Sequence, residues 1–208
     1  MEVEGEKTKA DGTNDSGKRG IPDYYLEPPE VLESMFQRFA VEKVMPPVEV
    51  LRFQSIIGLP YIARVSKDYK FPSPYRLHAS EQNERICFPR EDEVGVYCDF
   101  FTSGFRFPLD KDVETLLTYY KLPLCQYFPT AIRAIIAFIS LIRNIGVPFS
   151  VGVFRHFYQL RISPEDVWAT IVARPNCRLI MDAPSKVKGW KVKYIFVRVP
   201  EGFPLRRK

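Results

Sequence analysis

The most informative segment of the chain reads PTAIRAIIAFISLIRNI, residues 129–145. Pro129 suits a first helical turn, and the apolar side chains that follow recur on almost every side of a helix. A helix that is apolar all round is buried, so we expect this one at the centre of the core. Its longest uncharged run, residues 134–142, has nine residues. A bilayer-spanning helix needs about 20, so the segment is not a membrane span.

Shorter helices are expected before this segment. Residues 29–40 and 48–57 carry apolar side chains at helical spacing, and Pro60 is placed to end the second helix. Residues 61–92 mix Pro, Ser and Asn with single aromatics and show no period, so we expect irregular structure with short strands there.

Three further helices are expected around the central one. An apolar stripe over residues 94–101 predicts a helix that ends at Gly104. Asp110 is a good N-cap for a helix over residues 111–120, and Ser150 is a good N-cap for the helix that follows the central one.

After Pro164 the pattern changes to alternating and β-branched residues. Residues 168–172, 178–181 and 192–199 are therefore expected to be strands of a small antiparallel sheet, with turns that include Gly189. A helical group of about five to six helices followed by such a sheet is typical of the α+β class.

The chain divides into four expected segments. Residues 1–28 hold seven acids, four bases and few large apolar side chains, which predicts a disordered tail. Residues 29–92 form N-terminal helices and an irregular segment, residues 93–204 form the α+β domain, and residues 205–208 are a basic end.

The four cysteines contain no Cys-x-x-Cys pair, so zinc-finger and redox spacings are absent. We expect free thiols, mostly buried, and no metal or cofactor site. No apolar leader follows Met1, so we expect an intracellular protein with no membrane partner.

The strongest local charge lies at the C-terminal end, where eight bases face Glu201 alone between residues 186 and 208. Such a cluster can neutralise phosphates, although a solvated strand face would look the same. Tyr194, Phe196 and Phe203 would be available for base stacking if they were exposed. The candidate nucleic-acid contacts are Lys186, Lys188, Lys191, Lys193, Arg206, Arg207 and Lys208.

Four motifs occur in a characteristic order and spacing. They are DEVGVY (92–97) followed by GFRFPL (104–109), QYFPTAIR (126–133), FRHFYQL (154–160) and SKVKGWK (185–191). Together they resemble the plant gypsy-type transposon domain, also labelled transposase-like, of retrotransposon-derived proteins. The resemblance implies transposon ancestry and supplies no reaction. Relatives commonly continue further, so it also implies that this is a short copy.

A transposase or integrase would need two or three carboxylates that converge on metal ions. No acid stands at the end of a buried strand with a second acid beyond it. His78 lies in a polar loop without an expected partner, His156 lies on an aromatic helix, and the glycine-rich phosphate loops are absent. We therefore expect no enzyme activity and no small-molecule substrate. The available acids are Asp99, Asp110, Asp112, Glu114, Asp166 and Asp182.

The expected function is a non-catalytic domain that is nucleic-acid-associated or capsid-like. One alternative is a protein–protein interaction module in which residues 93–160 bury aromatic side chains against another subunit. An exposed patch around Phe101, Phe105 and Phe107 would favour that alternative. The other alternative is a relic metal-dependent nuclease or transposase.

Overall fold

The structure is a computed structural model that describes residues 52–162, 168–180 and 187–205. These residues form five α-helices and two small antiparallel sheets, so the predicted α+β class is confirmed. The helices are α3 (Leu59–Asp68), α4 (Cys98–Thr102), α5 (Lys111–Tyr120), α6 (Pro129–Asn144) and α7 (Val151–Phe157). The strands are β1 (Arg76–His78), β2 (Glu93–Tyr97), β3 (Tyr158–Ile162), β4 (Ala169–Ala173) and β5 (Tyr194–Arg198). Two short 3-10 helices are η2 (Leu124–Gln126) and η3 (Trp190–Val192).

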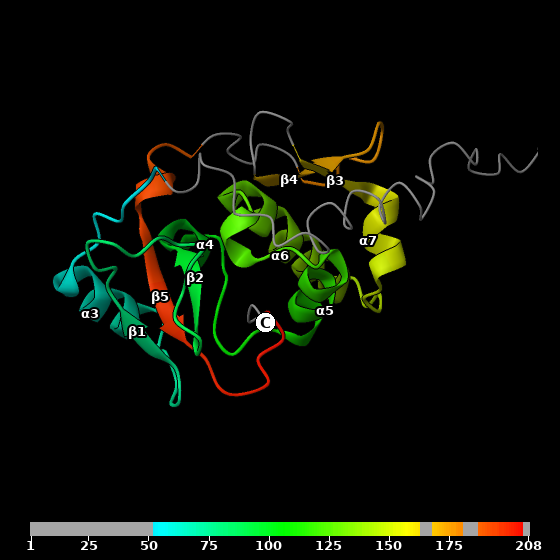
Figure 1. The fold of residues 1–208 in the computed structure, drawn as a ribbon. Helices are drawn as coiled ribbons and strands as arrows, with labels where there is room; N and C mark the ends of the chain where they lie inside the picture. Colours follow the sequence, from blue (N-terminus) through cyan, green and yellow to red (C-terminus); the bar gives the residue numbers. More distant parts are fainter. Residues whose placement is uncertain (1–51, 163–167, 181–186, 206–208) are drawn as a thin grey trace, which may run out of the picture.

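The larger sheet has β5 in its centre, antiparallel to β1 on one side and to β2 on the other. Phe196 stands opposite both His78 and Gly95. The smaller sheet is the antiparallel pair β3–β4. In Figure 1 the three-stranded sheet and α3 lie on one side of α6, and α7 lies on the other.

The sheets do not simply follow the helices as the sequence suggests, because β1 and β2 precede most of them and pair with the last strand. β1 therefore links the predicted N-terminal segment to the predicted α+β domain. The boundary between residues 92 and 93 stays a prediction. The predicted tail and the helix over residues 29–40 lie outside the described residues.

Helix α6 lies in the core and begins at Pro129, as predicted. It buries one full face, while its other positions are half-buried or exposed. It packs against α4, α5 and β4. Gly146 follows with φ +71°, a left-handed conformation that glycine adopts without strain. The buried face consists of Ala131, Ile132, Ile135, Phe138, Ile139 and Ile142.

Helix α3 corrects the prediction for the segment around Pro60. The described residues 52–57 are not helical, and the helix begins at Leu59 with Pro60 in its first turn. A proline in the first turn of a helix lacks only an N–H that would have no helical partner. The same proline can therefore either start a helix or follow the end of a preceding one. The expectation of irregular structure is therefore wrong for α3 and right for the short strand β1.

The apolar stripe over residues 94–101 is also divided differently from the prediction. Its first half is strand β2, fully buried and paired with β5, and only its second half is the helix α4. Gly95 is required here because a Cβ atom would lie 2.2 Å from the carbonyl oxygen of Ile86. Pairing with a distant strand has overridden the helical spacing.

The predicted caps and most of the predicted strands are confirmed. The Asp110 carboxylate accepts a hydrogen bond from the Asp112 N–H, and the Ser150 hydroxyl accepts one from the Val153 N–H. Strands β4 and β5 lie where alternation indicated them, but residues 178–180 form no strand. The expectation that they share one sheet is wrong, because β4 pairs with β3 and β5 pairs with β1 and β2.

Candidate functional site

The predicted basic cluster is only partly described by the structure. Lys186, Arg206, Arg207 and Lys208 lie outside the described residues. Lys188 is exposed, and Lys193 is half-buried.

Lys191 lies in η3, just before β5. Its ammonium group is 4.0 Å from the ring centroid of Trp168 and 5.2 Å from that of Phe53. These rings hold the charge by cation–π attraction inside a half-buried site. Lys191 therefore has a packing role within this chain.

The aromatic residues considered for stacking or for an interface are core residues. Tyr194, Phe196 and Phe203 are buried, so their rings are not available to bases. Phe101, Phe105 and Phe107 are buried too, so the exposed patch that would favour an interaction module is not formed by them. Their rings pack on one another instead.

A groove of about 570 Å³ lies between α6 and the edge of β4. The backbone holds its two walls together, since the Phe128 N–H donates to the Ala169 carbonyl at 3.0 Å. Thr130 and Arg133 line it from α6, Thr170 from β4 and Arg178 from the segment after β4. The remaining lining residues among those described are apolar or aromatic, and none of the described lining residues is acidic.

The stretch of sequence that supplies α6 and β3 is free of acidic side chains. From residue 115 to residue 164 the sequence contains no acidic side chain, whereas it contains Lys121, Arg133, Arg143, Arg155 and Arg161. The absence of nearby acids in this long stretch is a signal that sequence analysis could have used, and it was missed because the C-terminal cluster looked stronger.

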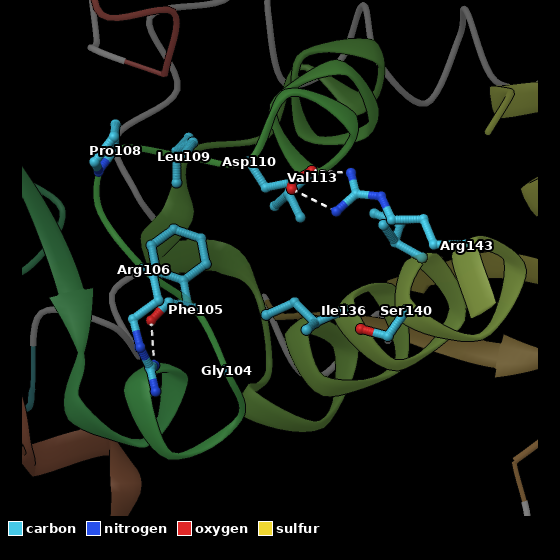
Figure 2. Close-up of a pocket in the computed structure, with 11 residues that line it drawn as sticks. Gly104, Phe105, Arg106, Pro108, Leu109, Asp110, Val113, Ile136, Ser140 and Arg143 are labelled. Atoms are coloured by element: carbon cyan, nitrogen blue, oxygen red, sulfur yellow. Dashed lines mark hydrogen bonds and ion pairs between the residues drawn. The ribbon is translucent and has the colours of Figure 1, made fainter. Parts of the chain in front are cut away.

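A second pocket, of about 380 Å³, is lined by the GFRFPL motif, α5 and α6. Figure 2 shows Arg143 at the end of α6 reaching across to Asp110 at the start of α5. Arg106 on the other side donates to the carbonyls of Phe101 and Phe105, each at 2.7 Å. Both arginines of this pocket are therefore engaged within the chain.

The Asp110–Arg143 pair has a clear electrostatic effect. The hydrogen bond from the Arg143 guanidinium lowers the pKa of the Asp110 carboxyl and raises the pKa of Arg143. Arg143 also bonds to Asp112, so two of the candidate metal-binding acids converge on a guanidinium. Asp99 lies on α4 and Glu114 on α5, while Asp166 and Asp182 lie outside the described residues.

The sequence analysis missed a polar cluster around His78. This residue lies in β1 rather than in a loop, with Nε2 3.0 Å from a Glu84 oxygen and Nδ1 3.2 Å from a Glu93 oxygen. Arg90 contacts both Glu81 and Glu84. A spacing of three residues between His78, Glu81 and Glu84 was the available signal.

The cysteines are free thiols, and Cys87, Cys98 and Cys125 are buried. Burial raises the pKa of the Cys98 thiol to about 12. The two sulfur atoms of Cys87 and Cys125 contact each other at 2.7 Å. Among the described residues, no helix is both long and apolar enough to cross a bilayer.

Residues 95–162 match a family model described as "Putative gypsy type transposon". The match covers about one third of the chain and includes three of the four motifs wholly or in part, together with every residue that lines the pocket of Figure 2. No curated protein and no solved structure matches the chain. The plant source of the relatives stays a prediction. For residues 95–162, the resemblance to a gypsy-type transposon domain is confirmed.

Proposed function

We propose that this chain is a non-catalytic, nucleic-acid-binding domain of a retrotransposon-derived protein, and that it binds single strands in the groove between α6 and β4. The observation that supports this most directly is the lining of the groove, whose described residues include two arginines, two threonines and no acid.

The polar residues of the groove suit a phosphate backbone. Arginine offers two parallel N–H donors to phosphate oxygens, and threonine hydroxyls add neutral hydrogen bonds. Arg133 and Arg178 approach the groove from different segments, so they can contact different phosphates. The stretch over residues 115–164 contributes no acidic side chain that would repel a phosphate.

The apolar lining of the groove suits the sugar and base of a nucleotide. Ala134 and Ala137 from α6 and Ile171 from β4 present small or aliphatic surface between the polar groups. A sugar or the face of an unpaired base can pack on such a surface. The bases of a duplex are stacked on one another inside the double helix, so their faces are not available for this contact. This favours a single strand.

The proposed contacts in the groove are different residues from the C-terminal bases that the sequence suggested. Lys188 is exposed and can add to the attraction, but Lys191 is held by aromatic rings. The absence of catalysis is part of the proposal, and it is supported by Arg143, which takes up the carboxylates of Asp110 and Asp112.

The test is fluorescence anisotropy of the full chain with labelled single-stranded RNA, single-stranded DNA and duplex DNA across a salt series. We expect the single strands to bind more tightly, with an affinity that falls linearly with salt on logarithmic axes. Arg178→Gln removes one proposed phosphate contact and should reduce the salt slope by about one.

Lys67→Gln is the matched control, because Lys67 is equally an exposed cation but lies on α3. It should leave the slope within error of the unaltered chain. Equal effects of the two substitutions would contradict the proposed groove. The absence of binding by a folded sample at about 50 mM salt would contradict the proposed function itself.

A further inference from the structure

We propose that His78, Glu81 and Glu84 bind a first-row divalent transition-metal ion such as Zn²⁺, with Glu93 as the carboxylate that orients the histidine. The site is independent of the proposed nucleic-acid groove. It lies on β1 and the loop that follows it, whereas the groove lies between α6 and β4.

The ligand set meets in one place because of the sheet and one glycine. His78 and Gly95 stand on opposite sides of Phe196 in the three-stranded sheet, and the His78 ring stacks on Phe196 at 5.2 Å. Gly95 has no side chain, so the backbone at Ile86 can lie directly against β2. This brings the loop across the sheet and sets Glu84 beside His78.

The distances fit metal ligands. One ligand atom from each of His78, Glu81 and Glu84 lies within 4.8 Å of the others. His78 Nε2 and a Glu84 oxygen are 3.0 Å apart, a hydrogen-bond distance. Tetrahedral ligands that are each about 2.0–2.2 Å from one zinc ion lie about 3.4 Å apart, so these two atoms need to separate only slightly to bind it. Imidazole with carboxylate suits zinc and its neighbours in the first transition row.

The surroundings of His78 give a second geometric argument. The ring lies between two carboxylates, with Glu84 beside Nε2 and Glu93 beside Nδ1, and Nδ1 has no hydrogen-bond partner in the described part of the chain. The Glu93 side chain is only 3% exposed, and one of its oxygens has no hydrogen-bond partner in the described part of the chain. A buried carboxylate in that state is costly.

A metal ion bound at Nε2 would leave Nδ1 to carry the N–H of the imidazole, on the side of the ring where Glu93 lies. The carboxylate–histidine–metal arrangement is the usual way in which proteins fix the tautomer of a metal-binding histidine. Arg90 contacts one oxygen of Glu81 and one of Glu84. The second Glu84 oxygen accepts from the Glu81 N–H at 2.9 Å, which holds it beside His78 Nε2 with a lone pair left for an ion.

The test is isothermal titration calorimetry of the EDTA-treated full chain with Zn²⁺ and, separately, Mg²⁺ at neutral pH. We expect one Zn²⁺ per chain and much weaker Mg²⁺ binding. Glu81→Gln and His78→Ala should each weaken Zn²⁺ binding at least tenfold, and Glu93→Gln should weaken it about 10–100-fold. His156→Ala is the matched control, since His156 is exposed on α7, and it should change nothing.

Several results would overturn the proposal. These are no Zn²⁺ binding by a folded sample, Mg²⁺ binding as tight as Zn²⁺ binding, or unchanged affinity in Glu81→Gln. Glu81 is 70% exposed, so that variant keeps the test valid even if His78→Ala does not fold. Titration with Co²⁺ identifies the donor atoms, because a thiolate-to-metal absorption band would assign binding to a cysteine and would also overturn the proposal.

Discussion

Lys191 has a structural role that its charge alone does not reveal. Its ammonium group lies over Trp168 and Phe53, and the neighbouring Trp190 is buried. A cation–π contact contributes about 0.5–2 kcal/mol to stability, and the larger values belong to contacts from which water is excluded. Because this site is half-buried, the contribution should lie in the upper part of that range.

We predict that Lys191→Ala lowers the free energy of unfolding by about 1–2 kcal/mol, measured by urea denaturation. Lys188→Ala, at an exposed position three residues earlier, should stay within about 0.5 kcal/mol of the unaltered chain. Lys191→Arg should recover most of the loss, because a guanidinium also binds aromatic faces. Equal stability of Lys188→Ala and Lys191→Ala would contradict the aromatic contact.

At the scale of elements, Asp110 connects two helices. Its carboxylate caps α5 through the Asp112 N–H and also accepts from the Arg143 guanidinium near the end of α6. An acid in the first turn and a base in the last turn both suit the helix dipoles. The pair is partly exposed, so its contribution to stability is modest.

We predict that Asp110→Asn reduces stability at neutral pH and flattens the acid dependence. Hydrogen bonding to Arg143 lowers the pKa of Asp110 from its ordinary value of 3.8. A lowered folded-state pKa stabilises the fold above the unfolded-state pKa, and this contribution disappears as pH falls through the folded-state pKa. The stability difference between the two proteins should therefore shrink as pH falls below about 3.8.

Asparagine caps a helix as well as aspartate does, so this substitution isolates the charge. The measurement is urea denaturation between neutral pH and the acid transition. Asp68→Asn is the control, since Asp68 is exposed at the end of α3, and it should show no such convergence. A difference that stays constant with pH would show that the Asp110 charge does not contribute.

At the scale of the whole molecule, β5 holds the fold together. It is the central strand between β1 and β2, and Ile195, Phe196 and Val197 are almost fully buried. Burial of each such side chain contributes about 1.5–3 kcal/mol. The residues that match the family model start within β2 and stop before β5, so they contain only part of β2 and lack its partner strand.

We predict that a fragment of residues 95–162 does not fold by itself. Its thermal denaturation, followed by circular dichroism, should show no cooperative transition, whereas the full chain should show one. A cooperative transition in the fragment would mean that β5 is not required. In the full chain, Val197→Ala should cost about 1–3 kcal/mol, because it leaves a cavity between β1 and β2.

The features that sequence analysis predicted correctly depend on neighbouring residues. Pro129 starts α6, Asp110 and Ser150 cap their helices, and Gly104 and Gly189 adopt positive φ. Each follows from what one residue allows its own backbone to do. The α+β class and the resemblance over residues 95–162 follow from such local patterns taken together.

The features that only the tertiary structure revealed depend on residues that are distant in sequence. Residues 93–97 have helical spacing in the sequence. They form a strand instead because they pair with β5, which lies about 100 residues later in the chain. Strand β5, between β1 and β2, also brings His78 beside Glu93. The fold places Arg178 and Arg133 in the lining of one groove. The role of a charged side chain or a histidine depends on which residues lie near it in space. Hydrophobic burial determines these neighbours, and because it is not directional, the local sequence does not reveal them.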